Sequence, residues 1–80
     1  MNEFELYDEL LAIKDAVNDF CDVMQVRMNI KAREGWQGWN NPANQALFEQ
    51  RLQESVAKQE WVNVANYAMM LERIKAASNE

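Results

Sequence analysis

The sequence predicts an all-α protein, and three observations support that fold class. Its 80 residues include only two glycines and one proline. These helix breakers, Gly35, Gly38 and Pro42, all lie in one short window, so long unbroken runs remain on either side. Apolar residues recur at intervals of three and four in those runs, which is the period of an amphipathic helix. We expect a long N-terminal helix packed on a helical hairpin or on a second long helix.

The first helix is expected over residues 3–33. Asn2, followed three residues later by Glu5, matches a capping box, which satisfies free N–H groups at a helix start. Apolar positions then step by four and three along one face, which we call the inner stripe: Leu6, Leu10, Ile13, Val17, Phe20 and Met24. Beyond it the apolar residues move to a different face: Val23, Val26, Met28 and Ile30. The helix is therefore expected to change packing partners near its C-terminal end.

The inner stripe is a candidate self-association surface. At 1.5 Å per residue the helix is about 45 Å long, which is more than one small hairpin covers. A chain of this size buries only about 60% of its unfolded surface, so the lone monomer is marginally stable. We therefore expect a homo-oligomer, and a dimeric bundle of antiparallel hairpins would bury the stripe. Its mixture of Leu, Ile, Val, Phe and Met leaves the number of chains open.

A loop and two further helices complete a single helical domain over residues 1–80. The loop is expected over residues 34–41. Asn41 before Pro42 is a favourable helix start, with asparagine as the cap and proline at the first helical position. Helices are then expected over residues 42–58 and 60–77.

The boundary between the last two helices stays open at this stage. No glycine or proline lies near Gln59, so a sharp bend and a continuous helix both fit the sequence. The block from Trp61 to Leu71 is apolar nearly all round, interrupted by Asn63 and Asn66, which predicts a helix buried on several sides. We expect this block to form the core, with its aromatic and sulfur side chains inside: Trp61, Met69 and Met70.

Composition excludes several kinds of catalytic or metal site. The sequence has no histidine, which removes Ser-His triads, histidine zinc sites and imidazole acid–base chemistry. Cys21 is the single cysteine, so an intramolecular disulfide is excluded, and its apolar neighbours predict a small core residue. The acidic N-terminus does not resemble a secretory signal, and no apolar run reaches membrane-spanning length. We expect a cytoplasmic protein that does not contact membranes and carries no cofactor.

Charge is unevenly distributed along the first helix. The chain has a net charge of −5; residues 1–22 carry seven acids against Lys14, whereas Arg27, Lys31 and Arg33 follow without an acid. An acidic balance disfavours direct nucleic-acid binding, because lysine and arginine provide affinity for phosphates.

Aspartates recur along the side of the helix mostly opposite the inner stripe: Asp8, Asp15, Asp19 and Asp22. They are either a solvated face, a partner-binding surface, or a mimic of a phosphate row with charges about 5 Å apart. Two pairs, Glu5 with Asp8 and Asp19 with Asp22, also have the i, i+3 spacing of a metal pair. A metal site would need a second helix that brings further carboxylates across.

Two tryptophans, Trp36 and Trp39, lie in the glycine-containing loop. They either pack across a helix end or contact a partner, a role that tryptophan often has at interfaces.

Several segments together resemble one known family. They are Met24-Gln25-Val26-Arg27-Met28, Lys31, the Gly35-Trp36 pair and Val64-Ala65-Asn66-Tyr67-Ala68-Met69-Met70-Leu71. In this order they resemble the phage-encoded MazG-like nucleotide pyrophosphohydrolases, often labelled dATP/dGTP diphosphohydrolases. The resemblance covers about residues 24–74.

The resemblance implies a catalytic site that this chain has lost. In that family a Glu-x-x-Glu pair and a Glu-x-x-Asp pair on facing helices hold magnesium against a nucleoside triphosphate. Glu60 matches the first position of the second pair, but Asn63 stands at its partner position. The first pair falls on Ser55 and Lys58, and a lysine there opposes a cation. The resemblance thus implies the family scaffold without its hydrolysis, with Glu60 as the one residual candidate ligand.

These observations predict a small phage-type accessory protein, not an enzyme, that binds and modulates a host or phage protein. The binding residues are expected on the acidic side of the first helix, in the tryptophan loop, or in both. One alternative is residual magnesium-dependent dNTP pyrophosphohydrolysis through Glu60 and acids from elsewhere. Another is an acidic nucleic-acid mimic that inhibits a DNA-binding enzyme through Asp8, Asp15 and Asp22.

Overall fold

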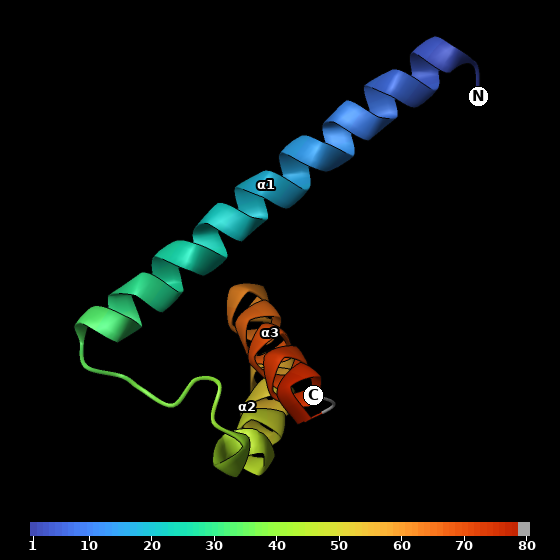
Figure 1. The fold of residues 1–80 in the computed structure, drawn as a ribbon. Helices are drawn as coiled ribbons and strands as arrows, with labels where there is room; N and C mark the ends of the chain where they lie inside the picture. Colours follow the sequence, from blue (N-terminus) through green and yellow to red (C-terminus); the bar gives the residue numbers. More distant parts are fainter. Residues whose placement is uncertain (79–80) are drawn as a thin grey trace.

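The computed structural model describes residues 1–78 and has the all-α fold that the sequence predicts (Figure 1). Helix α1 spans Glu3–Arg33, a short 3-10 turn η1 spans Pro42–Asn44, and helices α2 and α3 span Gln45–Ala57 and Trp61–Ser78. Helices α2 and α3 form a hairpin. Figure 1 shows this hairpin beside the C-terminal half of α1 only, while the N-terminal half of α1 extends away from it.

Helix α1 begins with the predicted capping box. The side-chain oxygen Oδ1 of Asn2 accepts a hydrogen bond from the backbone N–H of Glu5 at 2.8 Å, and the Glu5 carboxylate accepts from the backbone N–H of Asn2 at 3.4 Å. The Glu5 carboxylate is therefore engaged in capping, which gives Glu5 a structural role other than the metal pair suggested by its spacing to Asp8.

Helix α1 ends in a Schellman motif that positions the tryptophan loop. Gly35 adopts a left-handed conformation at φ +91°, and its N–H donates to the carbonyl of Ala32. The N–H of Trp36 donates to the carbonyl of Lys31, which completes the motif. The Lys31 ammonium lies 5.8 Å from the centre of the Trp36 ring, so the motif also brings these two side chains together.

Helices α2 and α3 are separate, and the same motif divides them. The N–H of Gln59 donates to the carbonyl of Val56, and the N–H of Glu60 donates to the carbonyl of Ser55. Gln59 occupies the left-handed position at φ +59°, where a glycine is usual. The chain thus reverses here through these hydrogen bonds, without the glycine or proline that usually marks such a turn in a sequence.

The core is small and is centred between α2 and α3. Its buried apolar side chains are Phe48 from α2 with Met70 and Ile74 from α3. Partly buried side chains surround it: Met28, Trp36, Trp39, Tyr67, Met69 and Leu71. Helix α1 contributes no buried residue. The long helix is thus attached to the hairpin by a contact patch near its C-terminal end.

Two core predictions are wrong, both for positional reasons. Cys21 is exposed, because α3 crosses α1 nearer to Met24 and Met28, and the hairpin does not reach further along α1. Trp61 is 55% exposed, because it is the first residue of α3 and lies at the reversal from α2. Met70 is buried as predicted, and Met69 is half-buried at the edge of the core.

The exposed surface is large for the mass. The chain exposes 6383 Å². A compact monomer of 9.4 kDa exposes about 5,000 Å², so the excess is roughly 1,400 Å². Most of the large exposed apolar side chains belong to α1. No helix within residues 1–78 combines the length and the apolar character that crossing a membrane requires.

Candidate functional site

The inner stripe of α1 is uncovered over most of its length. Leu6, Leu10, Ile13, Val17 and Phe20 are each between 39% and 55% exposed. Met24, the last member, is half-buried where α3 crosses α1, and its backbone carbonyl accepts a hydrogen bond from α3 there. The side of α1 that touches the hairpin at Met24 therefore continues towards the N-terminus as an apolar strip without a partner in the monomer.

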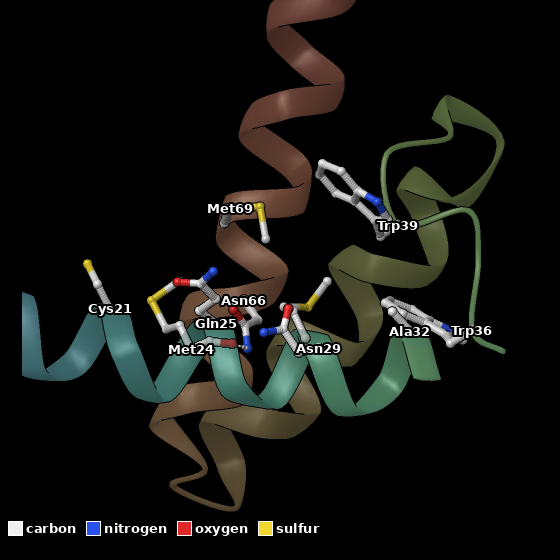
Figure 2. Close-up of a pocket in the computed structure, with 10 residues that line it drawn as sticks. Cys21, Met24, Gln25, Asn29, Ala32, Trp36, Trp39, Asn66 and Met69 are labelled. Atoms are coloured by element: carbon white, nitrogen blue, oxygen red, sulfur yellow. Dashed lines mark hydrogen bonds between the residues drawn. The ribbon is translucent and has the colours of Figure 1, made fainter. Parts of the chain in front are cut away.

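An apolar groove of about 530 Å³ lies where α1, α3 and the tryptophan loop meet (Figure 2). Helix α1 supplies Cys21, Met24 and Met28 to its wall, among other residues. The loop supplies the indole rings of Trp36 and Trp39, and α3 supplies Asn66 and Met69. Figure 2 shows Met24, Asn66 and Met69 near the crossing of α1 and α3, with Cys21 on one side of it and the two tryptophans on the other. Sulfur and aromatic groups make this groove an adaptable apolar surface.

A buried polar atom lies at the groove. The amide Nδ2 of Asn66 donates to the backbone carbonyl of Met24 at 3.3 Å. The side chain is only 3% exposed, and its Oδ1 has no hydrogen-bond partner within residues 1–78. An unpaired buried acceptor is costly, since it loses water without gaining a donor.

The opposite side of α1 carries a second exposed row, which we call the outer row. At about 100° per residue its members share one side of the helix, away from the inner stripe. They step by three and four throughout: Phe4, Asp8, Leu11, Asp15, Asp19, Asp22, Val26 and Ile30. Phe4 is 82% exposed and Val26 is 57% exposed. Sequence reasoning found the aspartates, Val26 and Ile30, but missed that they form one series with Phe4 and Leu11. It was wrong to place Met28 on the same shifted face, because Met28 lies one turn beyond Met24, packs against the core and lines the groove.

The two loop tryptophans pack against the core. The Trp36 ring centre lies 6.1 Å from that of Phe48, and both indoles are half-buried. Both also line the groove. The structure thus shows the packing alternative for this loop, and packing on the core leaves part of each ring exposed to the groove.

The residues that the resemblance assigns to a lost metal site form a chain of hydrogen bonds. Nδ2 of Asn63 donates to the Glu60 carboxylate at 2.7 Å, and Nη1 of Arg27 donates to Oδ1 of Asn63 at 3.0 Å. Lys58 lines the same polar pocket of about 200 Å³, and Ser55 is buried there at 6% exposed. Lys31 and Arg51 also line this pocket, as does a second carboxylate, Glu54. Within residues 1–78, no three Cys, Asp or Glu side chains are grouped as metal ligands would be.

The aspartates of α1 are brought to one helix side but are not joined by a second helix. Asp8, Asp15, Asp19 and Asp22 are all exposed and lie on the side of α1 away from the inner stripe, whereas the hairpin lies beside the C-terminal half of α1 and contacts it at Met24 (Figure 1). The i, i+3 pairs among these acids therefore have no facing carboxylates from α2 or α3.

Comparison of the chain with protein-family models, curated proteins and solved structures finds no match in any of the three. The resemblance to MazG-like proteins therefore stays a prediction.

Proposed function

We propose that the protein is a non-catalytic binding protein, built on a MazG-like scaffold, that docks on another protein and modulates it. It acts as a phage-type accessory protein in the host cytoplasm, and the partner is a host or phage protein. Helix α1 is the binding element. The observation that carries the proposal is that α1 exposes apolar side chains on two opposite sides, of which its own hairpin touches one and only at one end.

The outer row is the surface for the partner. Phe4, Leu11 and Val26 provide exposed apolar area, and burial of such side chains is worth about 25 cal/mol per Å². The aspartates between them disfavour association with acidic surfaces and favour a partner with lysine or arginine beside apolar side chains. Alternation of the two types also supplies specificity, because a purely apolar or purely basic partner leaves half of the row unmatched.

The same alternation argues against a nucleic-acid mimic. A phosphate row is continuously charged, whereas Leu11 separates Asp8 from Asp15, and Val26 and Ile30 end the acidic run. A DNA-binding enzyme would have to bury those apolar side chains against a groove built for phosphates.

The hydrogen bonds at Glu60 argue against residual hydrolysis. Its carboxylate accepts from Asn63, and Lys58 lines the same pocket. Magnesium prefers oxygen ligands and is repelled by an adjacent ammonium group. The enzymatic alternative would be established if the protein released pyrophosphate from dNTPs and Glu60→Gln abolished that release.

The proposal is tested by affinity capture from nuclease-treated bacterial lysate, followed by reconstitution with the purified captured protein. The first variant carries Asp8→Lys, Asp15→Lys and Asp22→Lys, and the second carries Leu11→Ser and Val26→Ser. A matched charge control carries Glu34→Lys, Glu49→Lys and Glu72→Lys, which change net charge equally at exposed sites outside the row. A third bait carries Trp36→Ala and Trp39→Ala.

The expected result is direct binding by the wild type and the charge control, with binding lost in both outer-row variants. Binding that survives in both outer-row variants contradicts the assignment to this surface. Loss in the tryptophan variant alone moves the partner site to the loop. Loss on charge reversal but not on Leu11→Ser and Val26→Ser indicates the acidic mimic instead.

A further inference from the structure

The groove at the crossing of α1 and α3 is incomplete in the monomer. It presents methionine and indole surface with a buried, unpaired acceptor, Oδ1 of Asn66. Its occupant therefore needs apolar side chains. The open inner stripe leads directly to this groove, since Met24 belongs to both. One occupant is thus expected to cover stripe and groove together.

The N-terminal turns of α1 carry the required groups. Leu6, Tyr7 and Leu10 are all exposed and lie on one side of the helix. Tyr7 combines a ring with an O–H donor. Helical periodicity places them on the same side of α1 as the groove-lining residues Cys21, Met24 and Met28 further along. The chain thus carries a groove and a matching segment on one straight helix, and the two are too far apart to meet within one copy.

An antiparallel second copy brings them together. Facing inner stripes place Leu6 of one copy opposite Met24 of the other, Leu10 opposite Phe20 and Ile13 opposite Val17. The exposed members Leu10, Ile13, Val17 and Phe20 are then paired with one another, and Leu6 lies level with Met24 at the groove beside α3. In this register residues 3–10 of one helix run beside residues 20–27 of the other, the section that walls the groove.

Charge favours the same orientation. Residues 3–22 of α1 are acidic, and Arg27, Lys31 and Arg33 follow. Antiparallel pairing places Glu3 of one copy level with Arg27 of the other, and the like charges that it also brings level, Asp8 with Asp22 and Asp15 with Asp15, lie on the outer sides of the two helices. Parallel pairing places like charges level throughout. The excess exposed area of roughly 1,400 Å² per chain also exceeds the roughly 800 Å² that each partner gives to a standard interface.

We propose that a second copy of this chain fills the groove, with the first turns of its α1 seated against Met24, Met69 and Trp39. The first copy fills the groove of the second in the same way. The result is a two-fold symmetric dimer with two identical grooves. The outer row faces away from this contact, so the inference goes beyond the proposed function and stands or falls independently of it.

The first test is the mass in solution, measured by light scattering after gel filtration. The wild type is expected at twice the monomer mass of 9.4 kDa. Ile13→Glu is expected to give a monomer that remains helical by circular dichroism. Ala12→Glu adds the same charge one residue away, on the outer side of α1, and is expected to remain dimeric. A monomeric wild type, or dimers of equal affinity in both variants, would overturn the proposal.

The second test fixes orientation by disulfide trapping in a Cys21→Ser background. Chains with Leu10→Cys and chains with Phe20→Cys, distinguished by tag length, are mixed and oxidised. Antiparallel pairing predicts a disulfide between the two kinds of chain, because Leu10→Cys of one copy is level with Phe20→Cys of the other. The same substituted position in the two copies is then about 15 Å apart along the helix axis. Predominant Leu10→Cys self-pairing would indicate parallel helices and contradict the inference.

The third test addresses the groove itself. Tyr7→Ala is expected to weaken dimerisation about tenfold or more, and the matched change Leu11→Ala, on the outer row, is expected to have little effect. Trp39 fluorescence, recorded in a Trp36→Phe, Trp61→Phe background, is expected to change on dilution into monomer. An unchanged spectrum, with unchanged affinity for Tyr7→Ala, would show that the groove stays open in the dimer and refute this assignment.

Discussion

The side-chain amide of Asn66 on α3 donates a hydrogen bond to the backbone carbonyl oxygen of Met24 on α1 at 3.3 Å. This contact lies where α3 crosses α1 and is one of two side-chain hydrogen bonds recorded between these helices within residues 1–78. It orients the amide so that Nδ2 is paired and Oδ1 is not. One residue thus fixes the crossing and also leaves the groove with an unpaired acceptor.

Asn66→Ala is expected to lower the free energy of unfolding by about 1–3 kcal/mol, because the buried hydrogen bond to Met24 is lost. Urea denaturation at fixed protein concentration measures the change. The control Asn63→Ala removes a similar amide at a more exposed position and is expected to cost less than about 1 kcal/mol. Equal effects of the two variants would contradict the structural role of Asn66.

Gln59→Gly is expected to stabilise the protein by about 0.5–1 kcal/mol. Gln59 has φ +59°, a conformation that costs a side chain about 1–2 kcal/mol and glycine little, although glycine adds entropy to the unfolded chain. Thermal or urea unfolding measures the gain. Gln53→Gly, an exposed position inside α2, is the control and is expected to destabilise by about 1 kcal/mol. Destabilisation by both variants would mean that the left-handed turn at Gln59 does not form.

Gly38→Ala is expected to destabilise the protein more than Gly35→Ala. Both glycines have positive φ, but a Cβ on Gly38 would lie 2.9 Å from Nδ2 of Asn44, and a Cβ on Gly35 would meet open space. The same Asn44 nitrogen donates to the Gly38 carbonyl. Urea unfolding of each alanine variant, repeated in an Asn44→Ala background, separates the cost of the contact with Asn44 from the cost of the positive φ. The excess cost at Gly38 should shrink in that background; an unchanged excess would exclude the Asn44 contact as its cause.

Magnesium at millimolar concentration is expected to leave the melting temperature unchanged. Lys58 lines the pocket of Glu60, and Arg27 donates to the Asn63 amide bonded to that carboxylate, so a cation has to displace paired groups. A ligand that binds the folded state alone raises the melting temperature, so a clear rise that Glu60→Gln removes would point to a surviving metal site.

Local signals in the sequence predicted the ends of the first helix well. Asn2 and Glu5 form a capping box through side chains three residues apart, and Gly35 has the residue type that a left-handed helix end favours. The second reversal uses the same hydrogen-bond pattern at Gln59, a residue type that gives no such signal. The sequence therefore left the separation of α2 and α3 open.

Burial along α1 was harder to predict, because it depends on where α3 crosses. Periodicity places Cys21 among apolar residues, but only the position of the crossing shows that it is exposed. Trp61 is apolar and begins the expected core helix, yet the turn before it leaves it in solvent. The groove joins side chains from α1, the loop and α3, and no single segment of sequence contains that arrangement.

The central structural claim is that α1 associates with a second copy through its inner stripe, and hydrogen–deuterium exchange of residues 4–20 tests it most directly. A helix end without tertiary contacts opens easily and exchanges quickly, because most helical stability in proteins comes from tertiary packing. The account predicts slow exchange at high protein concentration, faster exchange on dilution, and fast exchange at all concentrations in Ile13→Glu. Fast exchange of residues 4–20 in the wild type at every concentration, with the α2–α3 hairpin still protected, would contradict it.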